Sequence, residues 1–585
     1  MLGGTTARIA APPNRGLSRV VAHSRTALAK FGLYLPLLII GLFALAPILI
    51  AIVTSFRTSL PGEPATWGVD GWIAAFSSPA IGEAVANTFI LALMRVPFAV
   101  ALGALLAWLL IRTNVAGRRS IEFMFWIAFF LPTLPMAMAW ALLLDPGGGW
   151  VNLFARQVFG ATEPIFNIYS YFGITWVHLT ASTVPVMIIL MGPAFRSLDP
   201  SMEESARMCG ASSLAALRRI VLPLISPAII TASIASLIRS LEAFEIELYL
   251  GIPAGIRVYS TKMHELAIYD PPQYAPSMAL SVPFVGMLFL LALLYQRFLR
   301  RRQGGFATVT GKASAASPVD LGRWRLPATA LCMVLAGLVV VVPTVALLLG
   351  SFMGLFGVTY PGGGFAFTLE HWKAVLNDSL FFSSIMNTLE LGLGAAIAGV
   401  FAYSAVAYLI IRSRVAGRGV LDILVWLPWA IPGILLSLAL LWMYLGTPFL
   451  TVLYGSLLGL ILAMVFKEMP IGINLMKTGI LQISTELEEA ARVSGANWWQ
   501  TYWRLFFPLL APTATAVGML VFIACVKDIS TMVLLSTPET RPISILLLDY
   551  MTNGLIESGA VIGVISTLLT VGVAIVGRTI GMGLK

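Results

Sequence analysis

Two stretches of the chain combine charged, small and glycine residues in the same order. They read EESARMCG at residues 203–210 and EEAARVSG at residues 488–495. No catalytic triad or zinc motif accompanies them, and the four histidines are too dispersed to build one. The three cysteines form no spaced cluster, so neither a disulfide framework nor a metal site follows from them. With these catalytic and cysteine-based sites excluded, the two stretches are expected to bind a partner. The sequence does not identify metal ligands.

The first stretch is expected to fold as a short helix. Asp199 and Pro200 suit the N-cap and first helical positions. Glu203 and Glu204 lie in the first turn, where the helix dipole favours acidic side chains. Gly210 follows as a residue able to take the left-handed conformation that ends a helix.

The second stretch repeats this design. Ser484 or Thr485 serves as the cap, Glu488 and Glu489 lie in the first turn, and Gly495 ends the helix. One such loop would be read as a solvated helix that joins two spans. Two copies in register favour a pair of docking sites for a two-fold symmetric partner.

The spacing of other residues also supports helices in and after the two stretches. Glu203 and Arg207 are four residues apart, which suits a surface ion pair. After each glycine a second helix is expected to begin, at Ser212 or Asn497, and to run to a proline near the membrane surface.

A second group of charged residues lies at the end of two apolar runs. Glu242 and Glu245 stand in SLIRSLEAFEIELYLGIP, and Lys527 and Asp528 stand in LVFIACVKDISTMVLLSTP. Ionisable groups inside a membrane are costly and usually face a cavity or a partner. We expect these four residues to line a substrate path or gate. Glu242 and Lys527 occupy equivalent positions, so they either pair across the path or lie unpaired at the headgroup level.

The elements that position these residues are membrane spans. Of the 585 residues, 58% are hydrophobic and 11% charged, whereas soluble domains carry roughly 25% charged residues. Apolar runs of about 20 residues, enough to cross a bilayer, recur about twelve times. They lie near 32–54, 85–111, 121–144, 174–192, 222–241, 276–296, 326–351, 384–411, 420–445, 456–476, 507–526 and 559–577. The sequence predicts an all-α integral membrane protein.

The net charge of +10 follows the topology of such a protein. Lys and Arg mark cytoplasmic loops, and 27 of the 37 fall on one side if the chain crosses twelve times with both termini in the cytoplasm. The positive charge is therefore explained by the orientation of the chain in a lipid bilayer, and a nucleic acid partner is not expected.

The chain is an internal repeat. NT at 87–88 recurs at 387–388 and IRTNVAGR at 111–118 recurs as IRSRVAGR at 411–418, an offset of 300 that becomes 285 from Pro185 onward. Six spans separate the copies, so the two six-helix repeats are parallel. The expected division is a basic tail (1–31), a first half (32–300), a cytoplasmic linker (301–325) and a second half (326–585). No nucleotide-binding fingerprint appears.

The repeated loop resembles the cytoplasmic signature loop of permeases of binding-protein-dependent ABC importers of type I. That loop reads Glu-Ala-Ala, three residues, Gly, nine residues, Ile-x-Leu-Pro. The matching residues are Glu204, Ala206, Gly210 and Pro223 in the first copy and Glu489, Ala490, Ala491, Gly495 and Pro508 in the second. Ser205 departs from the pattern in the first copy, and Leu505 and Phe507 in the second.

The resemblance implies partners and a place in the cell. In that family each loop helix fits a groove on an ATPase subunit, so this chain would pair with two copies of such a subunit. ATP and Mg would bind there, and this chain would carry no cofactor and be no enzyme. An extracytoplasmic solute-binding protein would deliver the substrate. The expected location is the bacterial cytoplasmic membrane.

The expected substrate is ferric iron. Fused double permeases of this size most resemble the ferric-iron uptake branch, and the acidic residues suit a hard cation. Thiamine, a polyamine or a phosphonate within the same importer class are the alternatives. A secondary transporter with parallel repeats would also explain twelve spans, but not the duplicated loop.

Overall fold

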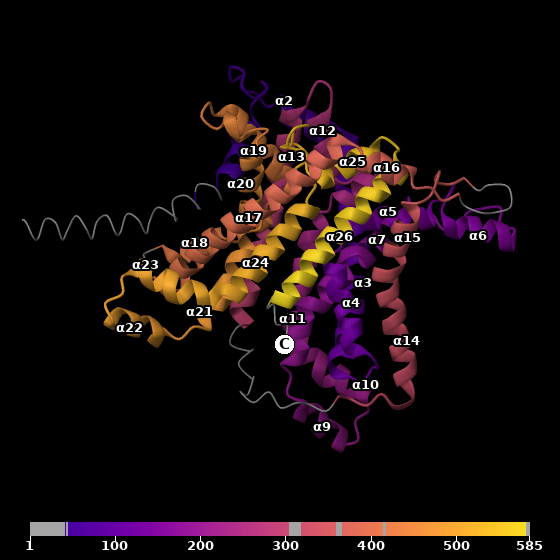
Figure 1. Ribbon diagram of the computed structural model, residues 1–585, viewed down its shortest axis with the longest axis vertical. Helices are drawn as coiled ribbons and strands as arrows, with labels where there is room; N and C mark the ends of the chain where they lie inside the picture. Colours follow the sequence, from indigo (N-terminus) through magenta and orange to yellow (C-terminus); the bar gives the residue numbers. More distant parts are fainter. Residues whose placement is uncertain (1–40, 42–44, 303–317, 359–365, 414–416, 581–585) are drawn as a thin grey trace, which may run out of the picture.

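The computed structural model describes residue 41 and residues 45–302, 318–358, 366–413 and 417–580. Within these residues every regular element is a helix, and the only β-pairing is three isolated bridges. The helices form a bundle from which α9 projects at the bottom and α22 at the left, while α12, α16 and α25 lie in the upper part (Figure 1). The prediction of an all-α fold is confirmed.

The described helices fall into two series. The first half contains α2 (Asp70–Ser77), α3 (Pro79–Arg112), α4 (Arg118–Phe130), α5 (Thr133–Leu144), α6 (Trp150–Phe159), α7 (Tyr171–His178), α8 (Val184–Arg196), α9 (Pro200–Met208), α10 (Ser213–Ala216), α11 (Leu222–Leu241), α12 (Tyr259–Ile268) and α13 (Tyr274–Arg302). The second contains α14 (Arg325–Ala336), α15 (Val342–Gly350), α16 (Glu370–Leu376), α17 (Ser379–Arg412), α18 (Arg418–Leu424), α19 (Gly433–Gly446), α20 (Leu457–Lys467), α21 (Met469–Leu481), α22 (Thr485–Val493), α23 (Trp498–Thr501), α24 (Phe507–Lys527), α25 (Ile543–Thr552) and α26 (Ile556–Ile580).

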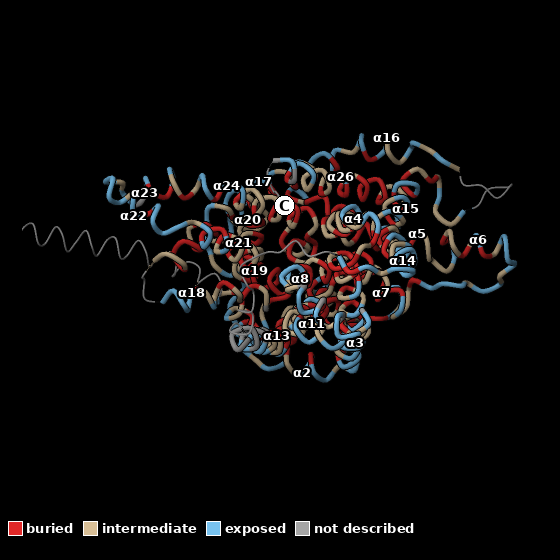
Figure 2. Tube along the Cα trace, turned by 90° about the horizontal axis from the view of Figure 1, so that it is seen from below, coloured by how far each residue is buried: buried red, intermediate tan, exposed pale blue. Residues whose placement is uncertain are grey.

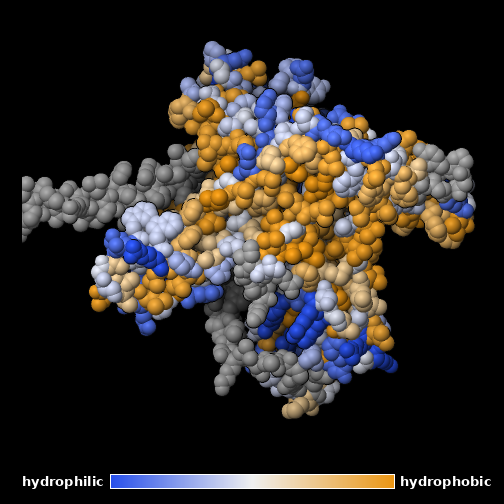
Figure 3. Space-filling view, in the orientation of Figure 1, coloured by the Kyte–Doolittle hydropathy of each residue, from blue (hydrophilic) through white to orange (hydrophobic). Residues whose placement is uncertain are grey.

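Within the described ranges, eight helical segments are long and apolar enough to cross a membrane. They cover Pro79–Arg112, Tyr171–Arg196, Leu217–Leu241, Tyr274–Leu291, Gly322–Gly350, Ser379–Arg412, Trp499–Lys527 and Ile556–Gly577. Their exposed side chains are largely apolar, as expected for surfaces that meet lipid, and the buried residues gather along the middle of the bundle (Figure 2). Hydrophobic residues dominate much of the outer face in Figure 3.

Three expected spans are not straight helices, which corrects the prediction of continuous spans at 121–144, 420–445 and 456–476. Helices α4 and α5 meet at 105°, α18 and α19 at 107°, and α20 and α21 at 58°. Pro132 and Pro432 stand at the first two breaks, and the residues before them are extended. Counting each bent pair as one span gives eleven among the described residues. The first expected span, 32–54, lies mostly outside them.

The first span of the second half packs against the first half. Cys332, Ala336 and Val339, from the segment of α14 and the turn after it, belong to one buried cluster with residues of α3, α4 and α8. Helix α15 lies against α5 (Figure 1). At its start the chain is tied to the first half, because Asn114 donates a hydrogen bond to Asp320 at 2.5 Å. This span therefore braces the other half's core.

Candidate functional site

The two predicted loop helices are present as α9 and α22, called here the loop helices. Asp199 accepts a hydrogen bond from the backbone N–H of Ser201 at 2.9 Å, and this bond lowers the pKa of the Asp199 carboxyl. Ser484 caps α22 by accepting from the N–H of Glu486 at 3.2 Å. Gly210 and Gly495 follow with φ of 86° and 81°, so both helices end in the left-handed conformation as predicted.

Both loop helices present large apolar side chains to solvent at equivalent positions. Met208 is 86% exposed and Val493 is 90% exposed, directly before the serine or cysteine that precedes the glycine. One and a half turns earlier, Met202 and Leu487 are 42% and 44% exposed. Sequence analysis missed these four residues, although each pair keeps the 285-residue offset. Exposed apolar clusters on a polar helix mark an interaction surface.

The first glutamate of each loop is buried rather than solvated, which corrects the prediction for Glu203. Its carboxylate pairs with Arg112 at the end of α3, 2.5 Å away, and both side chains are under 10% exposed. The predicted partner Arg207 has a side chain outside the described residues. In the second half the predicted spacing does hold, because Glu488 pairs with Arg492 at 2.5 Å and raises the pKa of that guanidinium.

The remaining loop residues are placed as follows. Ala206 and Ala491 are partly buried, Ala490 and Glu489 are exposed, and the side chain of Glu204 lies outside the described residues. Pro223 and Pro508 do not end a helix as expected. Each follows a five-residue π-helical turn, Leu217–Val221 or Tyr502–Phe506, inside one continuous span. A wider turn fits there because proline donates no backbone hydrogen bond.

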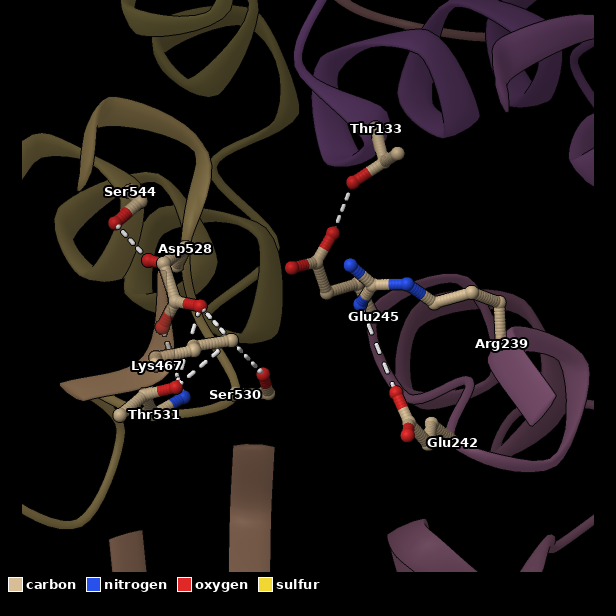
Figure 4. A network of polar contacts seen from close by, with 9 residues as sticks. All are labelled: Thr133, Arg239, Glu242, Glu245, Lys467, Asp528, Ser530, Thr531 and Ser544. Atoms are coloured by element: carbon tan, nitrogen blue, oxygen red, sulfur yellow. Dashed lines mark hydrogen bonds and ion pairs between the residues drawn. The ribbon is translucent and has the colours of Figure 1, made fainter. Parts of the chain in front are cut away.

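The second expected site forms where the broken helices of the two halves meet. We call it the inter-half cluster and define it by Arg239, Glu242, Glu245, Lys467, Lys527 and Asp528. Figure 4 shows its members other than Lys527 on facing segments of the two halves. The four predicted residues Glu242, Glu245, Lys527 and Asp528 are brought together. The structure adds Arg239, from the same charged stretch as Glu242, and Lys467, from a sequence position that gave no such signal.

On the first half, Glu245 accepts a hydrogen bond from the hydroxyl of Thr133, the first residue of α5 (Figure 4). The positive end of the α5 dipole therefore lies beside this carboxylate. Glu242 pairs with Arg239 of the preceding turn at 3.6 Å.

On the second half, Lys467 forms an ion pair with Asp528 and donates to Thr531 at 2.8 Å (Figure 4). Asp528 also accepts from the backbone N–H of Thr531 at 2.8 Å, and its side chain is 6% exposed. Both charges are therefore held by several polar contacts, as buried charges require.

Pairing of Glu242 with Lys527 is one of the two alternatives left open by the sequence, and the structure gives each residue a different partner. Lys527 instead crosses to the first half, donates to the carbonyl of Phe129 at 2.9 Å and lies 5.8 Å from the ring centroid. Arg239 crosses in the other direction and lies 5.5 Å from the ring of Trp429. Phe129 and Trp429 are equivalent residues at the two helix breaks, so each half offers an aromatic ring to a cation of the other. The Phe129 carbonyl is available to Lys527 because α4 ends there.

Glu247 lies apart from the cluster. It is buried, accepts a hydrogen bond from His178 Nε2 at 2.7 Å, and lies 3.7 Å from Arg95. His178 and Glu247 thus join two helices by a buried hydrogen bond. Among the described residues no group of three or more His, Cys, Asp or Glu is close enough to hold a metal ion.

Helix α19 begins at Gly433 against the second-half charges, and this position has no room for a side chain. A Cβ there would collide with Ser530 and lie 3.0 Å from Lys467 Nζ. We expect Gly433→Ala to lower the melting temperature of the purified protein, because overpacking costs about 1–3 kcal/mol. Gly446→Ala at the end of the same helix is the control, since no atom lies within 4 Å of its Cβ position. Equal melting temperatures for the two variants would contradict the expectation.

Comparison with known proteins places the chain in a family. The family model for binding-protein-dependent transport system inner membrane components matches residues 69–304 and 395–581. The ferric transport system permease protein FbpB of Actinobacillus pleuropneumoniae is 25% identical over 476 residues, 80% of this chain and 67% of that protein. A putative ferric transport system permease protein, FbpB 1 of Haemophilus influenzae, is 25% identical over 441 residues, covering 74% and 68%.

Some other relatives match a smaller part of the chain. The sulfate transport system permease protein CysT of Salmonella typhimurium is 28% identical over 235 residues, 39% of this chain and 81% of that protein. A crystal structure of a bacterial ABC transporter for alginate import is 20% identical with a TM-score of 0.40, covering 48% of this chain and 99% of that one. On the strength of the matching family model, the chain belongs to the inner membrane components of binding-protein-dependent transport systems and is an ABC importer permease, a transport subunit of the membrane.

Proposed function

We propose that this permease couples its substrate path to two ATP-binding subunits, one on α9 and one on α22. The observation that carries the proposal is the pair of exposed apolar residues repeated on both loop helices, Met202 with Met208 and Leu487 with Val493. Two equivalent surfaces suit two copies of one partner. ATP and Mg²⁺ would bind on those subunits, and this chain would contribute no cofactor.

The remaining partners follow from the family. A solute-binding protein would dock at the end of the bundle opposite the loop helices, and the loop helices and both termini would lie in the cytoplasm. The excess of Lys and Arg in the loops of that side supports this orientation.

The proposed cargo is ferric iron. Two of the relatives that span both halves are described as ferric transport permeases. The inter-half cluster contributes three carboxylates, Glu242, Glu245 and Asp528, and carboxylate oxygens suit a hard trivalent cation. Each carboxylate already has a protein partner, so the cation would pass by exchange with those partners rather than rest in an open site.

An oxyanion is the second candidate cargo. Arg239, Lys467 and Lys527 supply three positive charges to the same cluster, and two helices, α5 and α19, begin there. Helix starts and basic side chains favour anions. A relative that matches one half is described as a sulfate permease.

Uptake measurements test both the coupling and the cargo. Cells that lack this chain are compared with cells that carry the wild-type chain or the double variant Glu204→Lys and Glu489→Lys, using labelled ferric iron, sulfate, molybdate, thiamine and a polyamine. We expect iron uptake to return with the wild-type chain and to stay absent with the double variant, because the reversed charges would face the ATPase groove. Restoration of sulfate or molybdate uptake alone would replace iron by an oxyanion. Uptake that survives ATP depletion would favour a secondary transporter instead.

A further inference from the structure

The two longest helices of the chain have the same length and the same polar residues at both ends. Helices α3 and α17 each contain 34 residues and are offset by 300 positions. Near the start of each stands Asn-Thr, at 87–88 and 387–388, and each ends on arginine, Arg112 or Arg412. The Asn-Thr pairs and the terminal arginines lie outside the exposed apolar residues of the loop helices. Docking of a partner on those residues therefore does not explain why the pairs and the arginines are repeated.

At the start of the helices, the Asn-Thr pair holds a short helix that follows the inter-half cluster. Thr88 accepts a hydrogen bond from the backbone N–H of Tyr259 at 2.9 Å, the first residue of α12. Thr388 accepts from the N–H of Ile543 at 2.8 Å, the first residue of α25. Both hydroxyls are under 5% exposed. Each threonine thus caps a helix that belongs to a different part of its half.

The neighbouring asparagines add a second contact of the same kind. Asn87 donates to the carbonyl of Arg257 at 2.9 Å, and Asn387 donates to the carbonyls of Glu539 and Arg541 at 2.9 and 3.2 Å. The start of α3 or α17 is therefore bonded on both sides of the turn that leads into α12 or α25.

The capped helices are in turn bonded to the cluster. Ser260, the second residue of α12, donates to the carbonyl of Ala243, next to Glu242. Ser544, the second residue of α25, donates to the carbonyl of Asp528 at 2.7 Å. Ala243 and Asp528 are equivalent under the 285-residue offset. The same two bonds therefore link the start of each long helix to the charged cluster.

At their other ends the long helices hold the loop helices. Arg112 binds the carbonyl of Leu198 at 3.2 Å as well as Glu203, and Arg412 binds the carbonyl of Ile483. Leu198 and Ile483 are equivalent residues, each at the entry to its loop helix. In the second half the buried glutamate, Glu488, is held instead by Tyr408 of α17 at 2.9 Å.

These contacts span most of the bundle. Thr88 and Arg112 are 24 positions apart on one helix, which corresponds to about 36 Å at 1.5 Å per residue. A helix is stiff along its axis, so a displacement of its end is carried to its start. Two of these contacts recur in both halves, the threonine cap at the start of each long helix and the arginine bond to the carbonyl at the entry to each loop helix.

We infer that α3 and α17 are the elements that transmit movement of the loop helices to the inter-half cluster, with Thr88 and Thr388 as positioning residues at the transmitting contact. The inference rests on the proposed coupling to ATPase subunits. A purely structural role would predict that removing the hydroxyls weakens the fold but leaves coupling intact. The two roles are distinguished by whether removal of the hydroxyls abolishes the response of the inter-half cluster to ATP.

The test uses the permease purified from native membranes with its bound ATPase and placed in nanodiscs. All samples carry Cys209→Ser, because Cys209 is exposed, and Ala243→Cys as a half-buried reporter beside the cluster. The rate of maleimide labelling at the reporter is measured with and without ATP and vanadate. The variant is Thr88→Val with Thr388→Val, which keeps shape and removes both hydroxyls. Thr88→Ser with Thr388→Ser keeps them, and Thr180→Val is a matched buried threonine whose hydroxyl binds its own helix.

We expect trapping of nucleotide to change the labelling rate at least about fivefold, which is the lower end of usual allosteric coupling. This should hold for the parent protein, which carries only Cys209→Ser and Ala243→Cys, for the serine pair and for Thr180→Val. In the valine pair we expect the change to disappear while vanadate-sensitive ATP hydrolysis remains. A valine pair that still responds to nucleotide, or a serine pair that does not, would overturn the inference. A parent that carries no ATPase would refute the proposed function instead, so the two failures are distinct.

Discussion

Met208→Asp with Val493→Asp is expected to release the ATPase subunits and abolish ATP-driven uptake. Both side chains are almost fully exposed at the tips of the loop helices, and burying a side chain of this kind in a partner groove contributes about 1.5–3 kcal/mol. Aspartate removes that contribution and adds the cost of desolvating a charge. The loss per loop therefore exceeds a factor of roughly ten in affinity, where 1.4 kcal/mol is tenfold. Co-purification of ATPase activity from membranes measures it.

The control for this prediction keeps the apolar surface. Met208→Leu with Val493→Ile should retain the ATPase and transport, because the groove would still meet an aliphatic side chain of similar volume. Each single change, Met208→Asp or Val493→Asp, should lower the amount of recovered ATPase without abolishing it, because the other loop helix still offers an intact surface. Wild-type recovery of ATPase with the aspartate pair would show that these residues are not at the interface.

The loop helices could be predicted from sequence because their signals are local. A cap, acidic residues in the first turn and a glycine at the end act within a few residues of one another, and the structure has the Asp199 and Ser484 caps and both left-handed glycines. Glu203 and Glu488 lie in the first turn as predicted, whereas Glu489 lies beyond it and Glu486 takes that place. The burial of Glu203 could not be predicted this way. Its partner Arg112 lies 91 positions away, and only the packing of α9 against the end of α3 brings them together.

The charged cluster was predicted in position but not in pairing. Sequence equivalence placed Glu242 opposite Lys527, yet each finds a partner created by a helix break or a helix turn, Arg239 for the first and the Phe129 carbonyl for the second. Hydrophobic runs do not distinguish a straight span from two half-helices. Pro132 and Pro432 stand at two of the breaks, but proline alone does not predict a break, because α3, α11 and α24 each contain an internal proline and are continuous.

Lys467→Met is expected to destabilise the protein and stop transport. It leaves the carboxylate of Asp528, 6% exposed, without its cation, and removing one partner of a buried pair costs about 3–5 kcal/mol. Because the lysine side chain is itself 18% exposed, water reaches the site and we expect the lower end of that range. The melting temperature of the purified permease measures the effect on stability, and uptake measures the effect on the path.

Two further variants separate stability from transport at this pair. Lys467→Met with Asp528→Asn should recover most of the lost melting temperature, because the amide oxygen still accepts from the N–H of Thr531 and no uncompensated charge is buried. If the charges act on the cargo, uptake stays absent in this double variant although the fold is restored. Lys477→Met is the matched control, since its partner Asp422 is 37% exposed and such pairs contribute about 0–1 kcal/mol. A loss in Lys467→Met no larger than in Lys477→Met would mean that the buried pair does not hold the cluster together, and full uptake in the double variant would remove both charges from the transport path.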